Sequence, residues 1–203
     1  MTDINRRQTL KLLTAVPAAA AAFTWTAEEA GVAAAQAQQA RGQAAAANQP
    51  YTPKFFTAHE YATVVALAGM ILPKDSRSGS AVDAGAPEFI DFLIGEQADR
   101  QTAIRGGLMW LDNRCRARAD KAFVDCSDVE RGQVLDEIAW PGRAAPELSQ
   151  GVRFFNTMRD LVATGFWTSR IGIDDLGYIG NRPVAQWTGA PPEVLRKLGL
   201  QET

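Results

Sequence analysis

The fold is decided by one stretch of the chain, Phe55–Gln97, which reads FFTAHEYATVVALAGMILPKDSRSGSAVDAGAPEFIDFLIGEQ. Thr57 followed by Glu60 is a capping box, in which the threonine oxygen accepts an early amide and the glutamate binds the amide of Thr57. This pattern predicts a helix that begins near Thr57 and stops at Pro73, because a proline disfavours helical geometry in the residue before it. Apolar residues recur along one side of that helix at spacings of three and four: Tyr61, Val64, Val65, Ala68, Ile71 and Leu72.

A second helix is expected after a loop of small and polar residues. The loop, Lys74–Ala86, contains Ser, Gly, Asp and Ala instead of bulky apolar residues, and Pro87 lies where a helix would begin. The apolar face of this second helix comprises Phe89, Ile90, Leu93 and Ile94.

The order of these features resembles a known family. The sequence places FF-T-x-x-E, an apolar helix ending in Ile-Leu-Pro, the loop DSRSGS and then AGAPEFID along one stretch. This arrangement resembles the gluconate 2-dehydrogenase subunit 3 family, the small accessory subunits of membrane-associated, flavin-dependent sugar and alcohol dehydrogenases. The similarity is densest at Phe55–Asp91, with weaker echoes at Gly107–Asp112 and Gly177–Asn181.

Length and composition narrow the classes of function. The chain has 203 residues, which suggests one domain plus appendages. Its 21 basic and 23 acidic residues are close to balanced, and no basic patch is interleaved with aromatics, so nucleic acid is not an expected partner. Two cysteines and one histidine are too few for a structural zinc or iron–sulfur site built from this chain alone.

The N-terminal residues, 1–37, resemble a twin-arginine export signal. Arg6 and Arg7 precede an Ala/Leu run that extends to about Trp25, and small residues within 33–37 offer cleavage sites. The alternative is an amphipathic N-terminal helix. Either way the run is too short and too rich in alanine for a membrane span, which needs about 20 strongly apolar residues.

The next segment, residues 38–49, lacks large apolar side chains and is expected to form a disordered tether of Ala and Gln. The folded domain is then expected to comprise residues 50–203. Its interior helices continue with Gln97–Lys121, where Gly106 and Gly107 indicate a close helix contact or a bend. The expected buried stripe of that helix is Ile104, Leu108, Leu111 and Cys115.

Two more helices and a different kind of tail complete the prediction. Ser127 with Glu130 is a second capping box, and a further amphipathic helix follows from Pro146. Glycine and proline punctuate Thr168–Gly199, so turns are expected there, with a helix at Pro191–Leu198. No alternating strand pattern occurs. The predicted fold class is all-α: a compact domain of four or five helices with an irregular, Gly/Pro-rich C-terminal wrap.

The sequence contains no fingerprint for catalysis or for a cofactor. A glycine-rich dinucleotide motif, a P-loop and a GxSxG elbow are all missing, so no catalytic, cofactor-binding or metal-binding residue is assigned. His59 with Glu60 or Asp83 would be a conceivable general base, and the alternative is a half-exposed residue near a helix terminus.

Cys115 and Cys126 are a candidate disulfide if the chain reaches an oxidising compartment. The alternative is that Cys115 is a buried apolar residue and that Cys126 is incidental.

The resemblance implies a non-catalytic subunit that binds a large FAD-dependent dehydrogenase of the glucose–methanol–choline type and is exported with it by the twin-arginine translocase. FAD would then belong to the partner, and a cytochrome c subunit is a further partner that the family suggests. This places the chain in the periplasm, with attachment to the cytoplasmic membrane through the complex as an option. Aromatic or apolar residues that need cover are the expected contacts: Trp110, Tyr178, Ile179 and Trp187.

Two other classes of function stay open at this point. One is a free-standing periplasmic binding or structural protein that uses the loop Lys74–Ala86 for recognition. The other is an enzyme in its own right, with His59 and a carboxylate as its catalytic pair.

Overall fold

The computed structural model describes residues 25–178 and 189–199, and these residues contain helices and no strand. The all-α fold class is therefore confirmed. The elements are α2 (Ala27–Ala46), α3 (Ala58–Ile71), α4 (Ala81–Ala84), α5 (Ala86–Glu96), α6 (Ala98–Ala119), the 3₁₀ turn η2 (Phe123–Asp125), α7 (Asp128–Ala139), the 3₁₀ turn η3 (Pro146–Leu148), α8 (Ser149–Trp167), α9 (Arg170–Leu176) and α10 (Pro192–Lys197).

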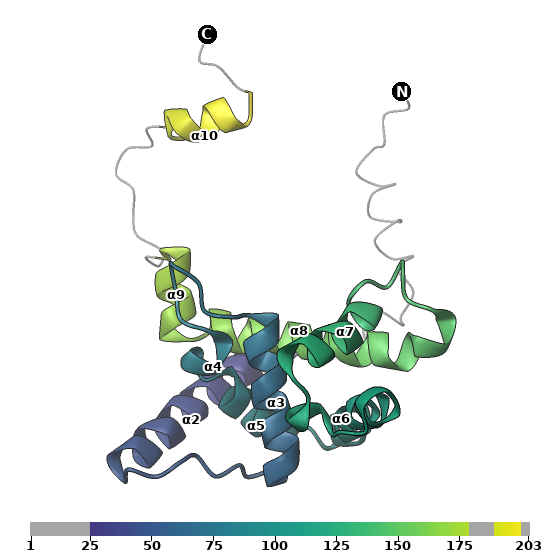
Figure 1. Ribbon diagram of the computed structural model, residues 1–203. Coiled ribbons are helices and arrows are strands. Elements are labelled where there is room, and N and C mark those ends of the chain that lie inside the picture. The colour runs from purple at the N-terminus through teal and green to yellow at the C-terminus, as the bar shows by residue number, and fades with distance from the viewer. Residues whose placement is uncertain (1–24, 179–188, 200–203) are drawn as a thin grey trace.

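Helix α8 runs across the molecule and organises the other helices (Figure 1). Helices α6 and α7 pack at its N-terminal end, whereas α4 and α9 pack at its C-terminal end. Helix α5 lies between α2 and α8, and nine of its eleven residues are buried. Helices α5 and α8 come close together at Gly165, where a Cβ atom would lie 2.9 Å from the ring of Phe89 and 3.1 Å from Cα of Ala86.

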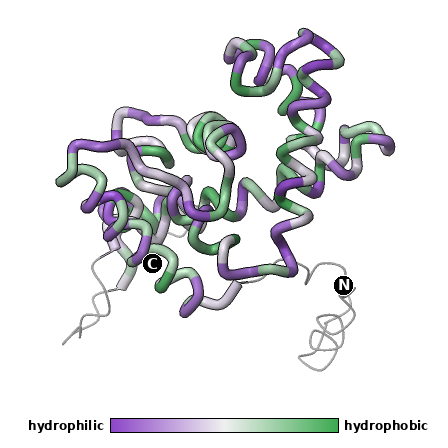
Figure 2. The backbone as a smooth tube through the Cα atoms, turned by 90° about the horizontal axis from the view of Figure 1, so that it is seen from below, coloured by the Kyte–Doolittle hydropathy of each residue, from purple (hydrophilic) through white to green (hydrophobic). Residues whose placement is uncertain are grey.

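Side chains cap the helices where the sequence predicted it. The hydroxyl of Thr57 accepts a hydrogen bond from the backbone amide of Glu60, and the Glu60 carboxylate accepts one from the amide of Thr57. Ser127 and Glu130 make the same pair of hydrogen bonds at the start of α7. A third capping box, Ser80 with Asp83, begins the short helix α4 within the segment expected to be a loop. Hydrophobic and hydrophilic residues alternate along the helices, as expected for elements that bury one side (Figure 2).

Asp91 explains why the Phe-Phe pair and the AGAPEFID segment occur together. Its carboxylate is fully buried and accepts four hydrogen bonds: from the hydroxyl of Tyr51 (2.7 Å) and the backbone amides of Lys54 (2.7 Å), Phe55 (3.0 Å) and Phe56 (2.9 Å). A buried carboxylate requires such partners, and here they fasten the segment before α3 onto α5. The two parts of the motif are therefore joined for a structural reason.

The prediction of a disordered tether at residues 38–49 is wrong for most of that segment. Helix α2 continues to Ala46, and its buried residues are Ala30, Ala33 and Ala37, which lie three and four positions apart. Alanine has high helix propensity, and its small side chain allows α2 to lie close to α5. The folded region therefore begins well before Pro50. Arg6 and Arg7 lie outside the described residues.

The segment after α8 is more helical than its glycine and proline content suggested. Ser169 caps α9, its hydroxyl accepting the amide of Gly172, and Gly177 ends the helix with a positive φ of 63°. Helix α10 agrees with the predicted helix at Pro191–Leu198, but none of its side chains is buried. Residues 179–188, which include Ile179 and Trp187, lie outside the described residues.

Candidate partner interface

A groove lies between α6 and α8, and two glycines bring its walls together. A Cβ atom on Gly107 would lie 1.9 Å from the ring of Phe154, so only glycine permits this contact. Across the groove, a Cβ atom on Gly151 would lie 2.4 Å from the ring of Trp110. Gly107 thus makes the close helix contact that the sequence predicted, whereas Gly106 faces open space.

The α6/α8 groove is mainly apolar and is lined by one basic side chain. Its volume is about 410 Å³, and Met109 beside Trp110 is 61% exposed. Arg153 is the one charged residue among those that line it, and no carboxylate of the described residues pairs with Arg153. Such a surface suits a partner that presents apolar side chains and a carboxylate.

A second groove, the Trp167 groove, lies where the end of α3 meets α7 and α8. Its volume is about 390 Å³, and it is lined by Met70, Ile71, Leu72, Gly132, Leu135, Asp136, Ala139, Phe155, Arg159, Ala163 and Trp167. Trp167 is 38% exposed and stands edge-on to Phe166, with ring centroids 4.8 Å apart. Leu176 and Tyr178 follow α8 in the chain and are also exposed, so three large apolar side chains lie at or beyond this end of the helix.

The residues predicted to contact a partner do not lie together. Trp110 packs against Gly151 at the start of α8, whereas Tyr178 lies beyond the end of that helix. At a rise of about 1.5 Å per residue, the 19 residues of α8 extend over roughly 28 Å. A partner that contacts both residues must therefore cover the full length of α8.

Trp167 and Trp140 were not selected from the sequence, although both are exposed. Trp167 follows Phe166 at the end of an amphipathic helix, and two adjacent aromatic residues on a helix cannot share one face. Trp140 directly precedes Pro141, where α7 ends. Both sequence positions could therefore have indicated exposed tryptophans.

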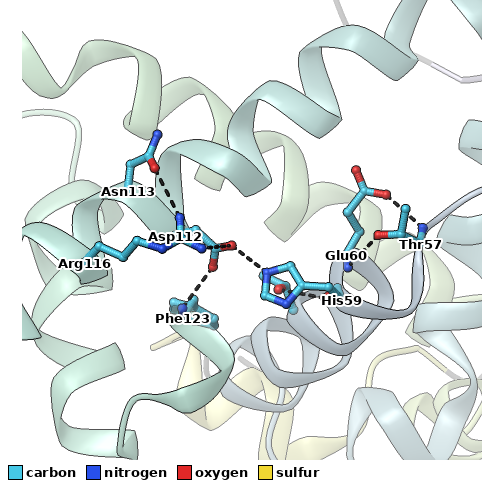
Figure 3. Close-up of polar contacts among 8 residues, drawn as sticks. Thr57, His59, Glu60, Asp112, Asn113, Arg116 and Phe123 are labelled. Carbon is cyan, nitrogen blue, oxygen red and sulfur yellow. Dashed lines mark hydrogen bonds and ion pairs between the residues drawn. The ribbon is translucent and has the colours of Figure 1, made fainter. Parts of the chain in front are cut away.

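His59 pairs with a different carboxylate from those predicted. Its Nε2 lies 2.5 Å from Oδ2 of Asp112, a buried residue of α6 whose Oδ1 accepts the amide of Phe123 (Figure 3). Glu60 instead binds the amide of Thr57, and Asp83 binds the amide of Ser80. The pair joins α3, α6 and η2, and Arg116 lies 3.5 Å from the same carboxylate oxygen of Asp112.

Cys115 and Cys126 are both buried free thiols and are within hydrogen-bonding reach of each other. Burial, together with the neighbouring Cys126, raises the pKa of the Cys115 thiol to about 12. A thiol with so high a pKa is a poor nucleophile at neutral pH. The geometry brings the predicted pair together, and the disulfide itself stays a prediction.

Two kinds of feature are not found in the part of the chain that the structure describes. Residues 25–178 and 189–199 contain no group of His, Cys, Asp and Glu side chains arranged to hold a metal ion. Within the same residues, no helix combines the length and the apolar character that a membrane crossing requires.

Comparison with known proteins identifies the family. The model of the family described as gluconate 2-dehydrogenase subunit 3 matches residues 58–189. The chain belongs to the gluconate 2-dehydrogenase subunit 3 family. No curated protein and no solved structure gives a significant match. Both grooves consist of residues inside the family match, whereas α2 precedes it.

Proposed function

We propose that this chain is a non-catalytic small subunit that binds the large, FAD-dependent subunit of a dehydrogenase acting on gluconate, another sugar or an alcohol. The large subunit would be a flavoprotein of the glucose–methanol–choline type, and the two chains would be exported together by the twin-arginine translocase. The observation that carries the proposal is the family match, because the family is named for a numbered subunit of such an enzyme.

The site chemistry supports a binding role over a catalytic one. The buried carboxylates Asp91 and Asp112 are engaged by backbone amides, and the capping carboxylates Glu60 and Asp83 serve helix starts. These contacts favour a structural role for the four carboxylates. FAD would be bound by the partner subunit, and electrons would pass from it to a cytochrome c subunit without involving this chain.

The proposed contact surface is the end of α8 that carries the Trp167 groove, together with Leu176 and Tyr178. Large exposed aromatic side chains beside an apolar groove are typical of interface anchors, and truncating such an anchor commonly costs about 2 kcal/mol or more in binding free energy. The α6/α8 groove with Trp110 is the second contact if the partner covers the whole of α8. Ile179 and Trp187 extend the proposed surface from outside the described residues.

The alternative of a free-standing periplasmic protein with a recognition loop has less support. The carboxylate of Asp75 accepts the amides of Arg77 and Ser78, and Arg77 binds Asp175 of α9. Residues 81–84 of the expected loop form α4. The segment is therefore fastened to the fold by its own polar groups, which leaves few of them for a ligand.

The test is coexpression of this chain with the dehydrogenase encoded beside it, with an affinity tag on the large chain alone. Trp167→Ala and Tyr178→Ala should each reduce recovery of the small chain at least tenfold, since about 1.4 kcal/mol corresponds to a factor of ten. Trp110→Ala tests the second groove. Trp140→Ala is the matched control, because Trp140 is exposed and lines neither groove.

A small chain that never copurifies with the flavoprotein contradicts the proposed function. Copurification that is unaffected by all of the substitutions contradicts the proposed surface and leaves the function standing. Loss with Trp110→Ala alone would place the contact in the α6/α8 groove.

A further inference from the structure

We propose that helix α2 is a permanent part of the mature subunit, and that the export leader is removed before Trp25 and not within the alanine-rich stretch 33–46. The second half of this statement rests on the proposed export. The first half depends only on how α2 is packed, and it can be tested separately.

The N-terminal end of α2 is fastened to two helices far away in the sequence. The indole Nε1 of Trp25 donates to Oγ1 of Thr164 in α8 (3.2 Å), and the guanidinium of Arg100 lies 5.6 Å from the centroid of the Trp25 ring. Thr26 and Glu29 form a complete capping box at the helix start. A segment that is removed by a signal peptidase is not expected to make such contacts with the folded domain.

The middle of α2 is fitted closely to the core. Ala30, Ala33 and Ala37 are 3–5% exposed, and α5 is the main helix that α2 packs against. Further along, Ala34, Ala37 and Arg41 lie against α4, α5 and α8, and the crevice left between them is only about 10 Å³. A groove of about 260 Å³, lined by Val32 and Ala33 among others, lies between the first half of α2 and α5, so the tightest packing of α2 is around Ala37 and Arg41.

The C-terminal end of α2 supplies the cation for a buried carboxylate. Arg41 donates to the carbonyl oxygens of Val82 (2.8 Å) and Asp83 (3.1 Å), and it lies 3.3 Å from a carboxylate oxygen of Glu88, which is buried in α5. Removal of Arg41 would leave Glu88 buried without its ion-pair partner, which is strongly unfavourable.

These contacts conflict with cleavage inside the helix. Signal peptidases read small residues in an unfolded leader, whereas the two sites suggested by the sequence at 33–37 lie in the packed part of α2. A cut after Ala37 would remove Trp25, Ala30 and Ala33, and a remnant of fewer than ten residues is too short to hold helical structure by itself. The sequence offers other small residues before Trp25, in the run of five alanines 18–22.

The first experiment measures the N-terminus of the exported protein. The full-length chain is expressed with its dehydrogenase in a host that has the twin-arginine pathway, and the periplasmic small subunit is analysed by intact mass and N-terminal sequencing. We expect a mature N-terminus between residues 19 and 25. An N-terminus anywhere within 27–46 would overturn the proposal, and an exported chain that keeps its leader would overturn the cut before Trp25 while supporting retention of α2.

The second experiment tests α2 whether or not the chain is exported. Ala33→Asp is compared with Ala35→Asp in the full-length chain, because Ala33 is buried and Ala35, two positions away on the same helix, is exposed. We expect Ala33→Asp to lower the Tm by about 5 °C or more and Ala35→Asp to change it by less than about 2 °C. Equal shifts would overturn the inference, whereas retention of an unprocessed chain in the cytoplasm would count only against the export proposal.

Discussion

Asp91 is the residue at which we expect a single substitution to reduce stability most. Replacing it with alanine leaves the hydroxyl of Tyr51 and three backbone amides without an acceptor in a buried place. We expect Asp91→Ala to lower the free energy of unfolding by about 3 kcal/mol or more, measured by urea denaturation. Asp99→Ala is the control, since Asp99 is exposed in the first turn of α6, and its loss should cost less than about 1 kcal/mol. Equal costs for the two variants would show that the Asp91 contacts contribute little.

The cysteine pair gives a second prediction at the residue scale. In an oxidising compartment the Cys115 and Cys126 thiols should transfer two hydrogens to a disulfide oxidant, which becomes a dithiol, and form one disulfide, because the two buried thiols are neighbours. Nonreducing mass spectrometry of exported protein should show a mass lower by two hydrogens than that of the reduced protein. The high pKa of Cys115 makes the reaction slow without a catalyst, so chemical oxidants at neutral pH should be inefficient. Two free thiols in exported protein would contradict the prediction.

Adjacent glycines allow a matched test at the scale of helix packing. Gly107→Ala would place a methyl group 1.9 Å from the Phe154 ring and force α6 away from α8, so we expect a loss of about 2 kcal/mol in stability. Gly106→Ala meets nothing within 4 Å and should instead stabilise α6 by about 0.5–1 kcal/mol. Thermal unfolding of the two variants should therefore shift in opposite directions. A shared direction would mean that the close contact is absent in solution.

The start of α7 gives a pH-dependent prediction. Hydrogen bonds from the amide and hydroxyl of Ser127 lower the pKa of Glu130, and Lys121 adds to the effect. A carboxyl with a lowered folded-state pKa contributes stability above its unfolded pKa and loses it as the pH falls through the folded pKa. Glu130→Ala should thus lower the Tm at pH 7, and its difference from the wild type should shrink at pH 3. Glu147→Ala, at an exposed glutamate, serves as control, and a Glu130 effect independent of pH would refute the capping role of the charge.

An element could be predicted well when the residues that stabilise it are close together in the sequence. The starts of α3 and α7 are fixed by residues three positions apart, Thr57 with Glu60 and Ser127 with Glu130, so the sequence alone predicts them. Helix α2 was missed because its alanines gain their stability from α5, which lies more than 40 residues away. The His59–Asp112 pair, 53 residues apart, was missed for the same reason.

For the whole molecule, the paired arginines make the decisive prediction about export. Replacing Arg6 and Arg7 together with lysine keeps the charge but removes the guanidinium forks, so the precursor should accumulate in the cytoplasm. Fractionation followed by immunoblotting measures the distribution. Lys11→Arg is a control that alters a nearby basic residue without touching the pair. Normal export of the double variant would contradict recognition by the twin-arginine route.

The burial of α5 has a consequence for the order in which the chain folds. Its cover comes from α2, which is synthesised before it, and from α8, which is completed only at Trp167. Until α8 has emerged from the ribosome, the side chain of Phe89 lacks its contact at Gly165. Most of the chain must therefore be made before its core can close, and the nascent subunit presents α5 as a surface that chaperones can bind.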